Sequence, residues 1–147
     1  DLSLLFEPRS IALIGASDRA GSLGGYSLQN LAEHSDFKGE LYLVNPRRAD
    51  INGRACWPSI TALPATPDLA VLAVPAPEVL PALTECAARG VRFAIVFTSG
   101  FGETGEEGKA LEAQMRALVA QSGMRIYGPN CPGLTNVNRR LGLTFSP

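Results

Sequence analysis

A glycine- and serine-rich segment follows the first apolar run of the chain, and its composition suits the binding of phosphate groups. The run Ser10–Ile14 ends at Gly15, and the segment Gly15–Gly25 holds four glycines together with the hydroxyls of Ser17 and Ser22. Glycines let backbone amides approach a phosphate closely, and the N-terminus of a following helix adds partial positive charge. The spacing departs from GxGxxG, so an alternative is that these glycines serve only the turn between a strand and a helix.

The second apolar run ends in a pair of arginines where many nucleotide-binding domains have an acid. An NAD-binding domain usually places Asp or Glu at this point, where the carboxylate holds the ribose diol. Here Val44 is followed by Asn45, Pro46, Arg47 and Arg48. A guanidinium group binds phosphate in a fork, so the pair suits a ribose that carries a phosphate, as in NADP or coenzyme A. The alternative is a pair of arginines that is only solvated.

Three later segments follow apolar runs and would complete the rim of the same site. Val74–Pro77 has no ionisable side chain and predicts a stiff apolar wall. Thr98–Glu103 offers two small hydroxyls that could bind a phosphate or a pantetheine amide, or equally cap the next helix. Gly128–Gly133 has two prolines and two glycines around Asn130 and Cys131, which predicts a rigid loop that presents amides in set positions.

Alternating apolar runs and helical patterns predict the elements that position these segments. Strands are expected at 10–14, 40–44, 69–74, 91–97 and 124–127, and helices at 25–35, 78–89 and from Thr104 to Gly123. Thr104 and Glu107 have the spacing of a capping box. Residues 47–56 are expected to form a loop and 59–63 a short helical turn. The fold class predicted is α/β: a single Rossmann-like domain with a doubly wound parallel sheet of about five strands in the order 3-2-1-4-5.

Composition limits the classes of protein to which the chain can belong. It has 147 residues, 46% of them hydrophobic, and a formal net charge of −1, which argues against a nucleic-acid partner. No apolar run is long enough to span a bilayer, so no membrane association is expected. An odd number of cysteines favours reduced thiols in the cytoplasm. One histidine, His34, cannot form a zinc site, and its predicted place at the far end of a helix argues against Cys131 as a nucleophile.

The segments at the strand ends together resemble a known family, the CoA-binding domain of the succinyl-CoA synthetase α-subunit and of the NDP-forming acyl-CoA synthetases. The resemblance covers nearly all of residues 1–147, which it implies to be one CoA-binding domain, and Gly128–Gly133 is its most specific part. The opening Leu5–Ala12 also resembles the start of the single-chain synthetases. It implies that coenzyme A or an acyl-CoA is the ligand. It also implies that the domain is the N-terminal part of a longer chain, and the final residues 144–147 are interpreted as the start of a linker.

The resemblance also implies roles for individual positions. The first loop would hold the CoA phosphates, and the last loop would lie near the thiol. The basic pair would contact the phosphorylated adenosine, and Arg48 is the position of the pair that matches the family. The residues implied to bind the cofactor are Gly15, Ser17, Asp18, Arg19, Gly21, Arg47, Arg48, Val74, Pro75, Thr98, Ser99, Gly100, Asn130 and Cys131. The family often has an acid after the threonine of the fourth turn, and this chain has Ser99 there.

The family's reaction joins an acid to CoA through a phosphohistidine, and that histidine and the ATP-grasp domain belong to other domains or a partner subunit. No catalytic residue is therefore expected in this chain. Two alternatives remain. One is a regulatory CoA-binding-like module fused to a GNAT-type protein lysine acetyltransferase. The other is an NADP-dependent Rossmann oxidoreductase, suggested by the glycine-rich turn and the arginine pair.

Overall fold

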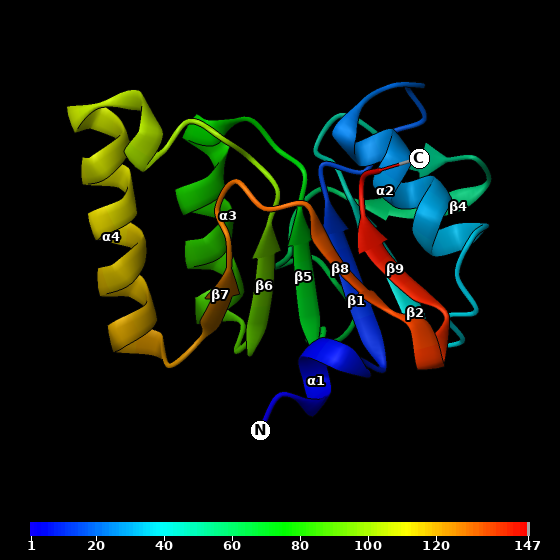
Figure 1. Ribbon diagram of the computed structural model, residues 1–147. Helices are drawn as coiled ribbons and strands as arrows, with labels where there is room; N and C mark the ends of the chain where they lie inside the picture. The colour runs from blue at the N-terminus through cyan, green and yellow to red at the C-terminus, as the bar shows by residue number, and fades with distance from the viewer. Residues whose placement is uncertain (147) are drawn as a thin grey trace.

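The computed structural model describes residues 1–146 and has one large sheet between two covering layers (Figure 1). The strands are β1 (Ser10–Ile14), β2 (Glu40–Val44), β3 (Asp50–Ile51), β4 (Arg54–Trp57), β5 (Leu69–Leu72), β6 (Phe93–Val96), β7 (Arg125–Tyr127), β8 (Gly133–Asn136) and β9 (Leu141–Thr144). The helices are α1 (Ser3–Phe6), α2 (Leu23–Ala32), α3 (Ala76–Ala88) and α4 (Glu106–Ser122), with 3₁₀ turns η1 (Gly102–Thr104) and η2 (Val137–Arg139).

The central strands are apolar throughout because both faces of the sheet are covered. All four residues of β5 and of β6 are buried, and so are four of the five residues of β1. Side chains of α3 and α4 pack on one face of the sheet, whereas α2 packs on the other. This two-sided burial is the pattern of a parallel sheet, and it confirms the predicted doubly wound α/β domain.

The strand order differs from the prediction at one point. The large sheet runs β3-β4-β2-β1-β5-β6-β7, and β5 pairs with β1, where 3-2-1-4-5 would have placed it outside β2. The outer position is taken by β4, which lies parallel to β2 inside the stretch 47–56 expected to be a loop. Counting β4 as the third strand gives 3-2-1-4-5-6. The order was therefore wrong because one short strand was missed.

Two residues of the local sequence explain why β3 and β4 form a hairpin. Asn52 and Gly53 join the strands, both with positive φ, of 53° and 76°. An Asn-Gly pair favours the two-residue turn that matches the twist of a hairpin. The side chain of Asp50 also accepts a hydrogen bond of 3.2 Å from the amide of Gly53.

The start of α4 also differs from the prediction. Thr104 does not form a capping box with Glu107, because its hydroxyl donates to the carbonyl of Phe101 at 2.8 Å. The helix begins two residues later, after Gly105, whose φ is +94°. Helix α2 likewise runs from 23 to 32, so His34 lies beyond its end.

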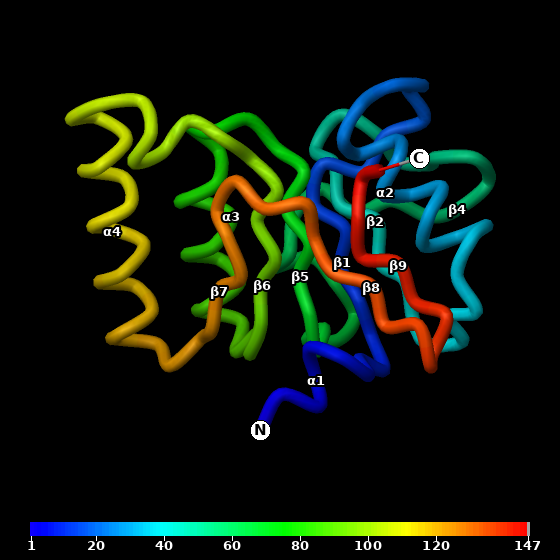
Figure 2. The backbone as a smooth tube through the Cα atoms, viewed as in Figure 1, coloured from blue at the N-terminus to red at the C-terminus, as the bar shows by residue number. Residues whose placement is uncertain are grey.

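The last residues do not form a linker up to position 146. They complete a hairpin of β8 and β9 that lies across one face of the sheet in front of β1 and β2 (Figure 2). Leu141 and Leu143 are buried there, and Asn30 of α2 donates to the carbonyls of Thr144 and Ser146, both at 2.8 Å. The hairpin thus covers apolar surface that a helix covers in many doubly wound domains. Within residues 1–146, no helix is both long and apolar enough to cross a membrane.

Candidate functional site

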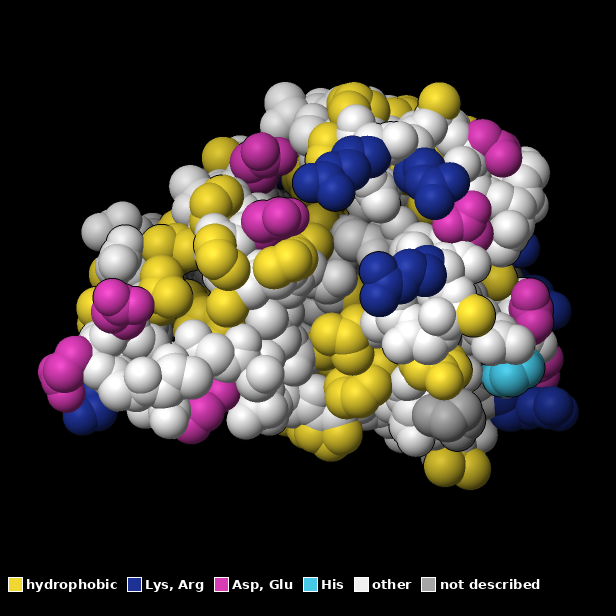
Figure 3. Space-filling model, turned by 90° about the horizontal axis from the view of Figure 1, so that it is seen from above, with side chains coloured by type: hydrophobic (Ala, Val, Ile, Leu, Met, Phe, Trp, Pro, Cys, Tyr) yellow, Lys and Arg dark blue, Asp and Glu magenta, His cyan; other side chains and the backbone are white. Residues whose placement is uncertain are grey.

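The loops that follow the parallel strands meet at the carboxyl edge of the sheet, where they surround a cleft of about 570 Å³. In an open α/β sheet this edge is where ligands bind. The cleft lies between the ends of β1, β2 and β5 and the first turns of α3. Its lining includes Gly15, Asn45, Arg47, Val74 and Pro75. Figure 3 looks onto this edge and shows Lys and Arg side chains gathered over one part of it.

Gly15 makes the turn after β1 possible for two reasons. Its φ of +87° is one that other residues rarely adopt, and a Cβ at this position would lie 2.4 Å from the carbonyl oxygen of Ala73. Helix α2 approaches the turn equally closely, since a Cβ on Gly24 would lie 1.9 Å from the carbonyl oxygen of Gly15. These two glycines therefore have a structural role. Because they carry no side chain, they also leave the backbone of the turn uncovered at the ligand edge.

The rest of the first loop is held by its own hydroxyls. The Oγ atom of Ser17 accepts from the amide of Arg19 at 2.9 Å, and Ser22 donates to the carbonyl of Arg19 at 2.7 Å. Ser22 also caps α2 by accepting from Gly25 at 3.0 Å. A second cleft of about 430 Å³ lies against the outer side of this loop and includes Ser17, Asp18, Arg19 and Gly21 in its lining.

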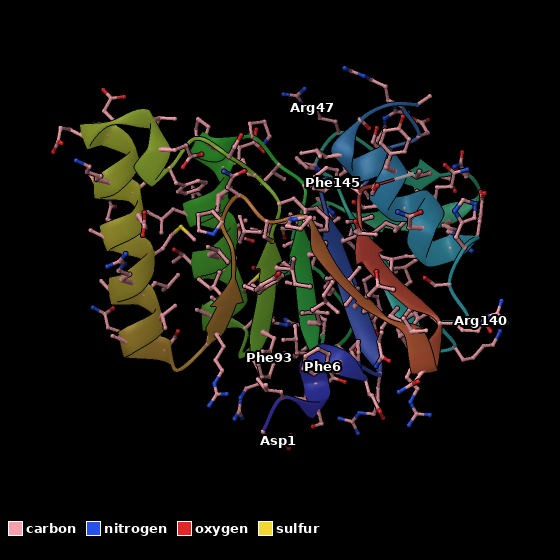
Figure 4. All side chains as sticks on the ribbon, in the orientation of Figure 1. Asp1, Phe6, Arg47, Phe93, Arg140 and Phe145 are labelled. Carbon is pink, nitrogen blue, oxygen red and sulfur yellow. The ribbon has the colours of Figure 1, made fainter. Side chains whose placement is uncertain are left out.

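The two arginines after β2 have different surroundings. Arg47 is exposed and contributes to the main cleft at the top of the molecule (Figure 4). Arg48 is absent from the linings described for both clefts. Its guanidinium donates to both carboxylate oxygens of Asp18, from Nη2 to Oδ1 at 2.9 Å and from Nη1 to Oδ2 at 3.1 Å. The structure therefore separates two neighbours that the sequence treats as a pair.

Asn45 is a site residue that the sequence analysis mentioned only as part of the strand end. Its Nδ2 donates to the carbonyl of Ala16 at 2.9 Å, and its Oδ1 accepts from the amide of Arg47 at 2.9 Å. One side chain thus joins the first loop to the second. The Asn-Pro sequence that ends the strand was the available signal, because Asn often bonds backbone two residues on.

Thr98 and Asn130 connect the remaining loops. The hydroxyl of Thr98 is buried and donates to the carbonyl of Val74 at 2.6 Å. The amide of Asn130 donates to the carbonyl of Thr98 at 2.9 Å, and Asn130 has a φ of +53°. Thr98 therefore holds the loops after β5, β6 and β7 in one arrangement. Ser99 beside it is exposed.

Glu103 is a second residue that the sequence analysis missed. Its Oε1 accepts from the amide of Gly100 at 2.7 Å, and this hydrogen bond holds the pKa of the carboxyl below its ordinary 4.5. The Gly100 amide is thus already bound to an anion supplied by the chain. The spacing Gly-x-x-Glu was its only signal in the sequence.

Cys131 is buried, and its thiol donates to the carbonyls of Val96 at 3.4 Å and Tyr127 at 3.6 Å. Burial raises the pKa of the thiol, so it stays protonated at neutral pH. Gly128 and Pro129, joined by a cis peptide bond, begin the loop that carries Cys131. Its contacts are those of a structural residue. Among residues 1–146 there is no group of three or more His, Cys, Asp or Glu side chains that could hold a metal ion.

Comparisons with known proteins identify the family to which the chain is similar. A family model described as a CoA binding domain matches residues 9–136. A trans-feruloyl-CoA synthase from an unknown prokaryotic organism is 43% identical over 96% of the chain. The α subunit of an ADP-forming acetate–CoA ligase II from Pyrococcus furiosus is 41% identical over 98% of the chain. The chain spans 20% of the first relative and 31% of the second.

A solved structure gives the same result for the fold. It is a dinucleotide-forming acetyl-coenzyme A synthetase 1 from Ca. Korarchaeum cryptofilum in complex with phosphate and ADP. It superposes with a TM-score of 0.93 at 39% identity, over 100% of this chain and 31% of that one. The likeness therefore extends over the whole length of this chain.

Proposed function

The chain belongs to the family of CoA-binding domains, and we propose that it holds coenzyme A for an NDP-forming acyl-CoA synthetase of which it is the N-terminal domain. The family match over residues 9–136 carries this proposal. The part of the proposal that concerns the whole enzyme rests on two relatives, a CoA synthase and a subunit of a CoA ligase, that are several times longer than this chain.

The residues at the carboxyl edge fit coenzyme A. The cleft of about 570 Å³ has apolar walls, among them Val74 and Pro75, with Arg47 at one side. Apolar walls suit an adenine ring and a pantetheine arm, while a guanidinium suits the phosphate on the ribose. The glycine-rich loop places backbone beside the same edge, where amides can bind the diphosphate.

Residues of this chain bind and orient the ligand in this proposal, and none of them carries out the chemistry. Coenzyme A, when bound, supplies the thiol that accepts the acyl group. Asn130 and Ser99 lie on the loops after β7 and β6, outside the lining of the main cleft, and we propose that with Gly100 they face the thiol end of the ligand. The buried, protonated thiol of Cys131 fixes its loop and does not act as a nucleophile.

The remaining parts of the enzyme are proposed to lie outside this sequence. A phosphohistidine-bearing domain and an ATP-grasp domain, in the same protein or in a partner subunit, would activate the acid. We place the enzyme in the cytoplasm, because the three cysteines Cys56, Cys86 and Cys131 are all free thiols. The regulatory module fused to an acetyltransferase has no support from the relatives named above, which are ligases or synthases.

Calorimetric titration of the 147-residue chain with CoA, 3′-dephospho-CoA, NADPH and NADH tests the ligand. We expect saturable binding of CoA, weaker binding of dephospho-CoA, and no binding of either nicotinamide nucleotide at the same concentrations. Arg139→Gln is a matched control, because Arg139 pairs with Glu7 at 2.8 Å, outside both clefts. Binding of NADPH without CoA would overturn the proposal in favour of an oxidoreductase.

A further inference from the structure

Three exposed apolar side chains lie at the edge of the sheet opposite the ligand edge. They are Leu2, Phe6 and Val137, which are exposed at 46%, 42% and 79%. Figure 4 shows Phe6 at the foot of the sheet, whereas Arg47 of the main cleft lies at its top. We call Leu2, Phe6 and Val137 the α1 patch. Single exposed apolar residues are common on any surface, but a group of them on one surface marks an interaction site.

Helix α1 has apolar side chains on two sides, and the domain covers only one of them. Leu4 and Leu5 are partly buried and pack against the core on the side of the sheet that α2 covers. Leu2 and Phe6 are four residues apart, and the amide of Phe6 donates to the carbonyl of Leu2 at 3.2 Å. This spacing places their side chains on the same face of the helix. Within residues 1–146 that face remains exposed to solvent.

Val137 is held beside this face by the residues that flank it. The Nδ2 atom of Asn136 donates to the carbonyl of Phe6 at 2.8 Å, and Nη2 of Arg139 donates to Oε2 of Glu7, also at 2.8 Å. These contacts join segments of the chain that are about 130 residues apart. The α1 patch is therefore a preformed surface, and a preformed surface loses little conformational entropy when it binds a partner.

A groove of about 460 Å³ lies next to the patch, between α1, η2 and the segment before β2. Its apolar lining is Phe6, Pro8, Phe37 and Leu141, and its charged lining is Glu7, Arg9, Asp36, Lys38 and Arg139. Among these charged residues only Lys38 makes no ion pair within residues 1–146. The apolar lining suits a bulky apolar side chain, and the ammonium group of Lys38 suits a carboxylate beside it.

We propose that the α1 patch and this groove dock a protein segment from the rest of the enzyme, one that presents a bulky apolar side chain next to a carboxylate. The inference rests on the part of the proposed function that places further domains or a subunit outside this sequence. The chain spans 20% and 31% of two relatives, so most of such an enzyme lies outside it. An apolar centre with a polar rim is the usual composition of a protein–protein interface.

Hydrogen exchange measured by mass spectrometry tests the docking. It compares the full-length protein that contains this sequence with the 147-residue chain. We expect residues 2–7 and 136–141 to exchange at least about 10-fold more slowly in the full-length protein, because docking suppresses the local opening of α1 and η2. Equal exchange of these segments in the two proteins would overturn the proposal.

Substitutions in the patch and groove assign the protection to particular side chains. In the full-length protein, Phe6→Ser, Val137→Ser and Lys38→Glu should each remove most of the protection of residues 2–7 and 136–141. Tyr127→Ser is the matched control, because Tyr127 is exposed at 43% but lies on β7, and it should keep the protection. Full protection in all three patch and groove variants would contradict the assignment of the surface.

The same variants of the 147-residue chain show whether an effect comes from the fold. Urea unfolding should have nearly the same midpoint in Lys38→Glu, Val137→Ser and wild type, because exposed side chains contribute little to folding. Sedimentation should find the wild-type chain monomeric. A dimer that Phe6→Ser abolishes would overturn the proposal in favour of a second copy as the occupant.

Calorimetry with CoA separates this inference from the proposed function. CoA should bind Phe6→Ser and wild type with the same Kd, since the α1 patch lies at the opposite edge from the main cleft. A full-length protein that protects both segments but binds no CoA would overturn the proposed function and leave the docking surface. A protein that binds CoA and leaves both segments unprotected would overturn the docking surface alone.

Discussion

The hydroxyl of Thr98 donates a hydrogen bond of 2.6 Å to the backbone carbonyl of Val74, and so joins the end of β6 to the end of β5. The carbonyl of Thr98 in turn accepts from the amide of Asn130, at 2.9 Å. Three of the loops at the ligand edge are therefore one hydrogen-bonded unit. The residue that the resemblance assigns to the ligand is also the residue that holds these loops together.

Replacing Thr98 with valine tests this double role. Valine fills the space of threonine but leaves the Val74 carbonyl without its donor, so we expect a loss of about 1–3 kcal/mol in the free energy of unfolding. Thr98→Ser keeps the hydroxyl and should lose less. Urea denaturation followed by circular dichroism measures both. Equal stability of Thr98→Val and wild type would contradict the structural role.

Gly15→Ala should be far more harmful than the same change at another glycine with positive φ. Gly15 has a φ of +87° and a Cβ there would lie 2.4 Å from the Ala73 carbonyl oxygen, whereas Gly53 has a φ of +76° and open space around it. Gly53→Ala should cost about 1–2 kcal/mol from conformation alone, and Gly15→Ala should add a steric clash. The measurement is again urea unfolding. Similar losses for the two variants would show that the clash is relieved.

Cys86 should be almost unreactive in the folded chain. Burial raises the pKa of its thiol to about 12, from an ordinary 9.0. At pH 8 the thiolate is then roughly one part in ten thousand of the population, and thiolate is the reactive form. Because the unfolded thiol ionises at the lower pKa, this group also makes the fold less stable as the pH rises from about 9 toward 12.

Alkylation with iodoacetamide at pH 8, followed by peptide mass spectrometry, checks this expectation. Cys86 should be labelled in urea and remain unlabelled in buffer over the same time. Labelling at equal rates in the two conditions would mean that the thiol is accessible in the native state.

Glu103 should contribute stability only where its carboxyl is ionised. The hydrogen bond from Gly100 lowers the pKa of Glu103 below 4.5 in the folded chain. The stabilising contribution of Glu103 is therefore present above pH 4.5. It is lost as the pH falls through the lower pKa that this carboxyl has in the folded chain. The Tm difference between wild type and Glu103→Gln should accordingly be larger at pH 7 than at pH 3. A Tm difference that stays constant with pH would argue against the charge of Glu103 as the source of the stabilisation.

The fold was predictable to the extent that its signals are local. Apolar runs predicted β1, β2, β5, β6 and β7, and the glycine-rich turn predicted the ligand edge. The β4 strand was missed because its four residues begin with an exposed arginine and contain only a short apolar run. The Asn52–Gly53 pair before it was nevertheless a usable signal for a hairpin. That single omission led to the wrong strand order.

Contacts between loops could not be read from the sequence in the same way. The pairing of Arg48 with Asp18 and the contact of Thr98 with Val74 join positions 30 and 24 residues apart. The residue types were identified as candidates, but nothing local indicates which partner each side chain will choose. The same holds for Asn30, whose amide reaches the chain 114 residues later.

The hairpin of β8 and β9 also determines when during synthesis the domain can finish folding. Residues buried on the hairpin side of the sheet, such as Phe97, have partners in the hairpin and in Phe145, whose ring centroid lies 5.2 Å from that of Phe97. These partners are synthesised after every strand of the large sheet. A nascent chain that ends before β9 would thus expose the part of this apolar face that α2 does not cover, and exposed apolar surface promotes aggregation or chaperone binding. Covering this face is the last step, and it must await translation of residues 141–146.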